Sequence, residues 1–285
     1  MRFGTMGFWT ALAVAGVACF ALANANVAES RGSAEDIRAS YKVGVGAIDL
    51  GTFDLTGVVD RTAYRLNAKG DFSILAGLVY RATGTTRSNG ERVDAVAKPQ
   101  RFDFSYTDTK KKQAMQIVFK NKAAPVVTRT PKKRPDKKAV PLSDGQLRNA
   151  LDPLTAAFLS VHGNFPAGDT AVCNQTLRVF DGKRLFELTL SPKRTAKLGR
   201  RAPDGLRDAA VCAVRYQPIG GHRQESSTVA YLQKSKGIEV WLVPIAGTGM
   251  FVPYKVVVPT TWGEGTVRLT KLKTQASAGR RASAR

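Results

Sequence analysis

Residues 41–57 read YKVGVGAIDLGTFDLTG, and this stretch decides the fold class. Apolar and polar residues alternate from Tyr41, the alternation shifts near Gly46, and it resumes at Ile48. Such alternation is typical of a strand with one buried face, because successive side chains point to opposite sides of a sheet. Glycines inside strands more often mark bulges or bends than regular pairing. The stretch therefore predicts a β-sheet that curves.

The alternating pattern recurs along the rest of the chain. The turn-forming pairs Asn89-Gly90 and Asp181-Gly182 separate alternating segments, and Asn89-Gly90 is typical of a two-residue hairpin. We expect strands at residues 39–47, 48–59, 62–73, 78–88, 101–106, 114–120, 172–180, 184–191, 210–218, 226–234, 237–245, 251–258 and 265–272.

One segment has a helical pattern. Ser143 and Asp144 can cap a first turn, and Asp152-Pro153 supplies an N-cap followed by the proline favoured at the first helical position. Leu154, Phe158 and Val161 follow at helical spacing and form a stripe that would face a core. Together these segments predict a mainly β protein, with a strongly curved antiparallel sheet that forms an open barrel or β-spiral around one or two short helices.

The first 25 residues have the parts of a secretory signal peptide. Arg2 is followed by an apolar run over residues 8–22 and by Ala23-Asn24-Ala25, which fits a signal-peptidase site. A membrane anchor is one alternative, but a run of about 15 residues is shorter than the roughly 20 that span a bilayer. A lipoprotein signal ending at Cys19 is another, although no leucine precedes that cysteine at the usual distance. We favour export and cleavage near Ala25.

Composition divides the chain after the signal peptide into three parts, the second of which contains an insert. We expect a polar lead-in at 26–38, a single β-rich domain at 39–273 and a disordered basic tail at 274–285. A lysine- and proline-rich insert at about 121–141 contains four prolines and little apolar sequence. Such a segment predicts a mobile, solvated loop or an extended excursion from the domain.

Two cysteines, Cys173 and Cys212, remain after cleavage near Ala25. An even number of cysteines in an exported chain favours a disulfide, because oxidising compartments form and keep such bonds. Two buried, reduced thiols are the alternative. We expect the disulfide to link two strands that flank a basic loop at 193–201.

The positive charge is concentrated in three segments. The chain has a formal net charge of +22, and residues 110–138 contain 11 Lys or Arg against one Asp. Residues 193–201 add five basic residues and 268–285 add six, with no acid in either. We interpret the three segments as basic appendages on a neutral scaffold. The group expected to bind anionic envelope surfaces consists of Lys132, Lys133, Arg134, Lys137 and Lys138; the alternative is that these residues only keep the protein soluble.

Four stretches of sequence resemble a bacterial envelope family. They are the opening YKVGVGAIDLGTFDL, then CNQTLRVFDGKRLFELTLSP, VCAVRYQPIGG and the C-terminal MFVPYKVVVPTTWGEGTVRLTKL. From these motifs the chain is identified as a member of domain-of-unknown-function family 3108, exported proteins of Gram-negative bacteria. The resemblance implies a periplasmic location and a β-rich fold, and carries over no catalytic residue. More loosely, the fold resembles half-open β-barrel lipoprotein carriers and β-spiral envelope proteins.

No motif in the sequence specifies a reaction. The chain contains no G-x-S-x-G and no S-x-x-K, and its two histidines and single remaining cysteine pair form no metal-ligand pattern. The basic segments lack the interleaved aromatic residues of nucleic-acid-binding surfaces. We therefore expect no catalytic residue, no metal site, no cofactor and no nucleic-acid partner.

The expected function is that of a non-enzymatic periplasmic binding or scaffolding protein in cell-envelope maintenance. It would hold a lipid, an acyl chain or a partner segment in an open barrel, with lipid headgroups, lipopolysaccharide, peptidoglycan or a periplasmic protein as partners. The alternative is a cell-wall or polysaccharide-acting enzyme with a pair of carboxylates. Asp49, Asp54, Asp71, Asp103 and Asp181 lie beside turns or on the polar face of strands, which favours the binding protein.

Overall fold

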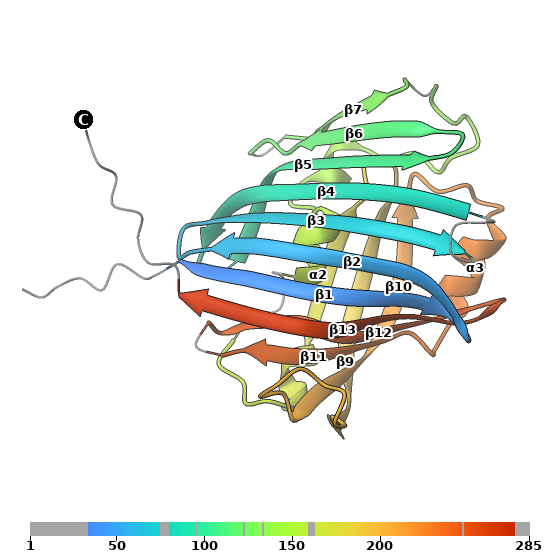
Figure 1. Ribbon diagram of the computed structural model, residues 1–285. Coiled ribbons are helices and arrows are strands. Elements are labelled where there is room, and N and C mark those ends of the chain that lie inside the picture. Colours follow the sequence, from blue (N-terminus) through green and yellow to red (C-terminus); the bar gives the residue numbers. More distant parts are fainter. Residues whose placement is uncertain are drawn as a thin grey trace, which may run out of the picture. The chain divides into compact units, whose positions relative to one another are not determined.

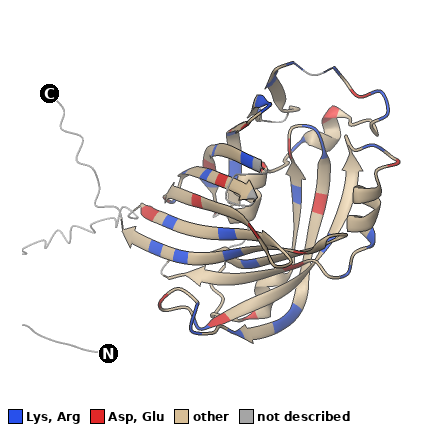
Figure 2. Ribbon diagram, turned by 45° about the vertical axis from the view of Figure 1, so that its right-hand side comes forward, with Lys and Arg blue, Asp and Glu red and all other residues tan. Residues whose placement is uncertain are grey.

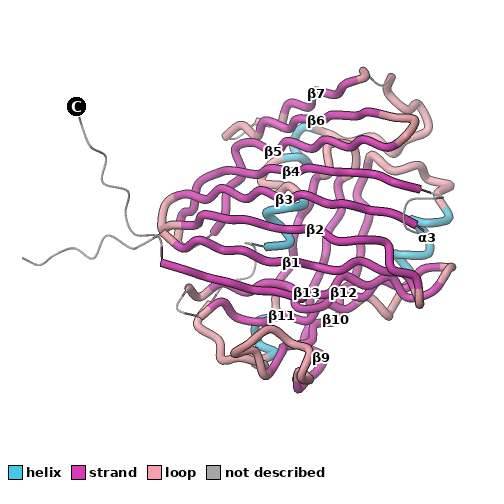
Figure 3. The backbone as a smooth tube through the Cα atoms, in the orientation of Figure 1, coloured by secondary structure: helices cyan, strands magenta, loops and turns pink. Residues whose placement is uncertain are grey.

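The computed structural model describes residues 34–276 apart from 75–79, 95, 122, 133, 159–162 and 247. The predicted signal peptide, most of the lead-in and most of the basic tail lie outside the described residues. Within the described part, 13 strands form one antiparallel sheet whose order is β7-β6-β5-β4-β3-β2-β1-β13-β12-β11-β10-β9-β8. The predicted fold class is confirmed: the protein is mainly β, its antiparallel sheet is not closed, and its described helices are few and short (Figures 1 and 3).

The elements follow the chain in a simple order. The strands are β1 (Glu35–Val45), β2 (Ile48–Val59), β3 (Ala63–Ile74), β4 (Tyr80–Val93), β5 (Val96–Asp108), β6 (Lys112–Val118), β7 (Val126–Thr130), β8 (Gln175–Phe180), β9 (Leu185–Lys197), β10 (Asp208–Gly220), β11 (Glu239–Ile245), β12 (Met250–Thr260) and β13 (Gly263–Ala276). The helices are α1 (Asp144–Leu147), α2 (Pro153–Phe158), the 3-10 turn η2 (Thr170–Cys173) and α3 (Ser227–Lys234). None of the described helices has the length and hydropathy needed to cross a bilayer.

The sheet folds around helix α2, which contacts β4, β8 and β12. Tyr41 on β1 stacks on Phe53 on β2 with ring centroids 4.6 Å apart, and Phe158 of α2 meets the Tyr41 ring edge-on at 5.7 Å. Leu154 and Phe158 are buried as the helical pattern predicted, whereas Val161 lies outside the described residues. The inward face of the sheet is therefore filled by the chain's own side chains.

Two glycine positions account for the interruptions in the opening stretch. Gly46 has a φ of 56° in the β1–β2 turn, and the β1–β2 register shifts between Val43 and Gly44. Gly51 on β2 has a φ of 134°, a conformation that side chains rarely adopt, and its α-carbon faces the backbone of Asp71 and Phe72 on β3. The interruptions in the opening stretch are thus a turn with a register shift beside it and a close approach between strands.

Two local predictions are wrong. Asn89-Gly90 does not form a hairpin turn but lies inside β4, where the register against β5 shifts between Asn89 and Gly90. A side chain at Gly90 would collide with the backbone of Lys98, so the glycine permits a close approach between strands. The predicted strand at 226–234 is the helix α3, because the Ser226 side chain accepts a hydrogen bond from the Val229 amide and caps a helix start.

The boundaries of the expected domain also shift. Residues 35–38 belong to β1 instead of the lead-in, and residues 274–276 belong to β13 instead of the tail, because β1 and β13 pair from Glu35 opposite Ala276. Two large aromatic side chains of the sheet and its turns are exposed: Trp262 is 88% exposed and Phe104 is 38% exposed.

A disulfide joins Cys173 and Cys212, which are 39 residues apart in sequence. Both cysteines are fully buried, among side chains that include Val172, Leu190 and Leu242. Cys173 ends the turn η2 and Cys212 lies in β10. The predicted pairing is therefore present, although it ties a 3-10 turn to a strand and not two strands to each other.

Candidate functional site

The two edge strands of the sheet approach each other without pairing. In the described structure β7 pairs only with β6 and β8 only with β9, so the sheet ends at a seam. One end of this seam is held together, because Arg129 of β7 donates a hydrogen bond to the Gly182 carbonyl in the β8–β9 turn. The same turn packs on Met115 and Ile117 of β6. The other end of the seam stays open.

A short segment before α2 determines where the seam opens. Leu151 forms an isolated parallel bridge to Val179 of β8: its amide donates to the Arg178 carbonyl and its carbonyl accepts from the Phe180 amide, each at 2.8 Å. Two residues earlier, Asn149 has a φ of 59°, which turns the chain away from β8. The edge of β8 is therefore covered at one end and uncovered near Thr176.

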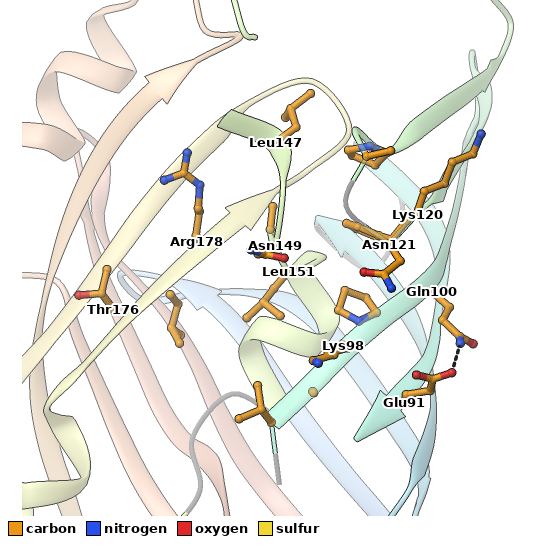
Figure 4. Close-up of a pocket in the computed structure, with 18 of the residues that line it drawn as sticks. Glu91, Lys98, Gln100, Lys120, Asn121, Leu147, Asn149, Leu151, Thr176 and Arg178 are labelled. Carbon is orange, nitrogen blue, oxygen red and sulfur yellow. Dashed lines mark hydrogen bonds between the residues drawn. The ribbon is translucent and has the colours of Figure 1, made fainter. Parts of the chain in front are cut away.

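A cavity of about 840 Å³ lies at the uncovered part of the seam. Figure 4 shows Asn149 and Leu151 between Thr176 and Arg178 on one side and Lys98, Asn121 and Lys120 on the other. The apolar part of the lining consists of Val96, Ala97, Pro99, Phe119, Ala123, Pro125, Leu147, Ala150, Leu151 and Leu177. A cavity of this size, with an apolar wall and a few polar groups, has the dimensions of a ligand pocket.

The charges around this cavity are mostly positive. The Arg178 guanidinium is already hydrogen-bonded within the protein: it donates to Glu187 at 2.9 Å and to the Gln146 carbonyl at 2.8 Å. Lys98 and Lys120 are exposed and, among the described residues, have no ion-pair partner. The one acidic lining residue, Glu91, accepts a hydrogen bond from Gln100 at 2.7 Å (Figure 4). The cavity therefore presents two free ammonium groups beside an apolar wall.

A buried polar network fixes α2 against the sheet beside this seam. The Asp152 carboxylate caps α2 by accepting from the Leu154 and Thr155 amides, each at 3.0 Å. Its second oxygen accepts from the hydroxyls of Ser88 at 2.8 Å and Thr155 at 2.6 Å, and the Tyr64 hydroxyl lies 2.9 Å from Thr155 Oγ1. Burial raises the pKa of Asp152, against the lowering effect of these hydrogen bonds. Burial likewise raises the pKa of Tyr64.

This network is unsuited to acid–base catalysis on a substrate. Asp152 is 0% exposed, and its oxygens are occupied by a helix cap and two hydroxyls. It is the one charged side chain in the buried core of the described residues. Its role is structural: it holds Ser88 and Thr155, and through them β4 and α2, in one position.

The lysine-rich insert is held against the rest of the protein, so the expectation of a mobile loop is wrong. The alternative expectation, an extended excursion from the domain, describes the insert better. Residues 126–130 form the edge strand β7. Beyond it, the Val140 amide donates to the His222 carbonyl and the Gly221 amide donates to the Val140 carbonyl, each at 2.8 Å. The one acid of the insert, Asp136, accepts from Arg223 at 2.7 Å and from Lys183 at 3.4 Å.

The basic residues singled out in the insert point outward from this anchored segment. Lys132, Arg134, Lys137 and Lys138 are exposed and, within the described part of the chain, form no ion pair. Lys133 lies outside the described residues. The hydrogen bond from Arg223 is the main reason that the pKa of Asp136 is lowered to about 2, so the insert keeps its anchor at neutral pH.

The interpretation of the basic segments as appendages is wrong for much of their charge. Eight of these residues lie in strands, as Figure 2 illustrates with blue bands along the sheet: Lys112, Arg129, Lys193, Arg194, Lys197, Arg268, Lys271 and Lys273. Residues 193–197 continue β9 and are not a loop. Lys193 and Arg194 pair with Glu239 at 2.6 and 3.2 Å, and Lys197 pairs with Asp208 at 2.8 Å.

The Glu239 cluster shows that part of this charge is paired within the sheet. Burial acts to raise the pKa of Glu239, but hydrogen bonds from Arg194, Lys193 and Trp241 outweigh it and lower the value to about 2. Arg194 and Lys255 also lie over the Trp241 ring, 5.3 and 5.6 Å from its centroid. Lys193, Arg194 and Lys255 are therefore engaged with neighbouring side chains on the sheet surface.

The acids that could have formed a catalytic pair are engaged locally. Asp49 accepts from the Gly51 amide, Asp54 from Ser40, Asp103 from Arg101, and Asp181 from the Lys183 amide, while Asp71 pairs with Lys69. In the described ranges, no group of three or more His, Cys, Asp or Glu side chains is arranged to hold a metal ion. These contacts are those of turns and strand surfaces.

Comparison with known proteins gives a family. A family model described as "Protein of unknown function (DUF3108)" matches residues 38–270. One similar solved structure is the "Crystal Structure of Beta-barrel-like Protein of Domain of Unknown Function DUF1849 from Brucella abortus". It is 10% identical, the match covers 86% of this chain and 99% of that chain, and the TM-score is 0.46. No curated protein matches the chain.

Proposed function

The chain belongs to the DUF3108 family, and from this membership and the geometry of the seam we propose that it is a non-enzymatic periplasmic binding protein of cell-envelope maintenance. Its ligand would occupy the cavity at the seam and not the interior of the sheet. The observation that carries this proposal is the location of the cavity: the interior is packed around Tyr41, Phe53 and Phe158, whereas about 840 Å³ is open at the seam.

The composition of the cavity supports a ligand that is partly apolar and partly anionic. Apolar lining such as Leu151, Phe119 and Leu177 favours apolar groups, and Lys98 with Lys120 favours a negative charge near the rim. The buried disulfide supports an oxidising compartment, which agrees with the signal peptide expected to end at Ala25.

A second part of the proposal concerns the insert. Lys132, Lys133, Arg134, Lys137 and Lys138 would hold the protein to anionic envelope surfaces such as lipid headgroups, lipopolysaccharide or peptidoglycan. Anchoring of the insert by Asp136 supports this, because charges on a fixed segment lose less conformational entropy when they bind than charges on a free loop. Each basic residue near an anionic surface contributes about 1 kcal/mol.

Native mass spectrometry of protein purified from periplasm tests the main proposal. We expect a chain that begins near Asn26 and carries additional mass from a bound ligand. Ala123→Trp would fill the cavity from its exposed rim and lower the ligand-bound fraction, whereas Ala230→Trp, on the exposed face of α3, would not. A bare chain in repeated preparations, or equal retention in both variants, would contradict the cavity as a binding site. A retained segment 1–25 or an acylated Cys19 would contradict export by signal cleavage.

A further inference from the structure

The uncovered edge of β8 exposes main-chain groups to the seam cavity. Backbone groups of successive strand residues point to alternate sides. The Arg178 carbonyl and the Phe180 amide both form hydrogen bonds with Leu151. The main-chain amides and carbonyls of the even-numbered residues of β8 therefore point away from β9. The β8–β9 register is continuous from Gln175 to Phe180, so the same holds for Thr176.

Three main-chain groups are therefore directed at the cavity without a strand partner in the described structure: the amide and carbonyl of Thr176 and the amide of Arg178. A strand continuing from Leu151 would cover them, but Asn149 turns the chain away at a φ of 59°. Leu151 itself shows the geometry that such a strand adopts, since one residue satisfies two groups of β8. An unpaired edge of this kind is a template for strand addition.

The geometry points to a strand-addition site: an extended, acidic segment of a partner polypeptide pairs with β8 at Thr176 and Arg178 inside the seam cavity. This rests on the proposed function, because it specifies the ligand class of the same cavity. Alternate side chains of the segment would contact the apolar wall at Leu151 and Leu177, and acidic side chains would meet Lys98 and Lys120.

The other occupants fit these groups less well. An acyl chain has no donor or acceptor for the three main-chain groups, and leaving such groups without partners is costly when water is displaced. A second copy that paired through its own β8 edge would bring its Lys98 and Lys120 toward the same rim. The chain's own tail at 277–285 contains three arginines and no acid, so its charge has the wrong sign.

The test uses defined probes: a capped peptide alternating valine with glutamate, a valine–lysine counterpart, and an acidic version N-methylated on alternate amides. Titration by fluorescence anisotropy and by amide chemical shifts should show binding of the acidic peptide and new hydrogen-exchange protection at the Thr176 and Arg178 amides. The lysine peptide should bind at least about tenfold more weakly, because its charge opposes Lys98 and Lys120. The N-methylated peptide should also bind about tenfold more weakly, because it lacks backbone hydrogen-bond donors.

Thr176→Pro supplies the matching change on the protein. Because the Thr176 amide faces away from β9, proline removes a donor from the edge and none from the ladder. We expect about tenfold weaker peptide binding by this variant, and a clearly smaller loss by Thr176→Ala, which removes side-chain contacts but keeps the amide. If Thr176→Pro does not fold, the N-methylated peptide on the wild-type protein makes the same distinction.

Dodecanoate separates failure of this inference from failure of the proposed function. Binding of dodecanoate at the seam without binding of the acidic peptide would overturn strand addition and leave the cavity as a binding site. If neither probe shifts the amides that line the cavity, both the inference and the proposed site are wrong. Equal binding of the acidic peptide and its N-methylated form would also overturn strand addition.

Discussion

Asp136 and Arg223 are 87 residues apart in sequence, and their side chains form a 2.7 Å hydrogen bond that ties the basic insert to the end of β10. Lys183 adds a second contact to the same carboxylate at 3.4 Å. The single acid of the insert is thus the group that fixes the position of its cations.

Asp136→Asn should release the insert and remove one source of pH dependence. The folded-state pKa of Asp136 is lowered to about 2 from an ordinary value of 3.8. A lowered folded-state pKa contributes stability above the ordinary value, and that contribution is lost as the pH falls through the folded-state value. The difference in melting temperature between wild type and Asp136→Asn should be largest near neutral pH and disappear between pH 3.8 and about 2.

The control for this variant is Asp204→Asn. The Asp204 carboxylate is exposed and forms no ion pair or side-chain hydrogen bond with the described residues. It should leave the melting temperature and its pH dependence unchanged. Hydrogen exchange gives a second readout, since the amides of Val140 and Gly221 should exchange faster only in Asp136→Asn. Unchanged exchange at both amides would show that Asp136 does not anchor the insert.

Replacing Lys132, Lys133, Arg134, Lys137 and Lys138 together by glutamine should weaken binding to anionic surfaces without loss of the fold. Exposed substitutions away from core features change stability by under about 0.5 kcal/mol each. Co-sedimentation with anionic vesicles and with peptidoglycan should fall at low salt. Wild-type binding should fall to the same level as salt rises, because the screening length is about 8 Å near physiological ionic strength.

A variant of equal charge change elsewhere on the surface is the matched control. Suitable exposed residues are Arg38, Arg61, Arg65, Arg81 and Arg215. If this control loses as much binding as the insert variant, net charge and not the insert is responsible. Equal binding by all three proteins across the salt series would assign the insert to solubility alone.

Removal of the disulfide should destabilise the protein without changing its fold. Closing a loop of 39 residues is worth about 3 to 4 kcal/mol in the chain-entropy model. Cys173→Ser with Cys212→Ser should lower the free energy of unfolding by about that amount, measured by denaturant titration. The oxidised wild type should contain no reactive thiol among residues 26–285, and Cys173→Ser alone should leave Cys212 available to a thiol reagent after unfolding.

Asp152 should tolerate an amide better than an apolar residue. Asp152→Ala removes the oxygen that caps the helix and the oxygen that accepts from two buried hydroxyls, which should cost about 2 to 4 kcal/mol. Asp152→Asn keeps an oxygen for the Leu154 and Thr155 amides and offers its NH₂ group to the hydroxyls of Ser88 or Thr155. We expect the asparagine variant to be close to wild type in thermal unfolding.

The pH dependence of Asp152 should have the opposite sign to that of Asp136. Burial raises its pKa, so the folded state favours the protonated acid and stability relative to Asp152→Asn should decrease as pH rises through the raised value. A wild type that becomes more stable than the asparagine variant with rising pH would contradict this assignment.

Much of the sheet could be predicted because its signals are local. The expected strand at 48–59 has the observed bounds, since residues with one buried face alternate in the sequence itself. The same locality explains the errors at Asn89-Gly90 and at 226–234. A glycine required by a neighbouring strand resembles a turn glycine, and Thr228, Val229 and Tyr231 are residue types that strands favour.

The candidate site could not be predicted because it depends on which distant segments meet. Lys98, Asn149 and Thr176 come from three separate parts of the chain, and none belongs to a motif. One local signal was present: asparagine is favoured at positive φ, and Asn149 stands just before the Asp152-Pro153 cap. The pairing of Lys193 and Arg194 with Glu239 also joins distant parts of the sequence. A count of charges within residues 193–201 could not reveal it, and these strand residues were therefore predicted to lie in a loop.

The pairing of β1 with β13 places the first and last strands side by side at the middle of the sheet. The hydroxyl of Thr270 donates to the Ser40 carbonyl at 3.0 Å across 230 residues of sequence. In spatial order the sheet runs β8 to β13 and then β1 to β7, so it is a single up-and-down meander whose chain start lies at its midpoint. Contacts of such high sequence separation form slowly. Because β13 is the last strand of the sheet along the chain, we expect the inner edge of β1 to stay unpaired during folding until β13 docks.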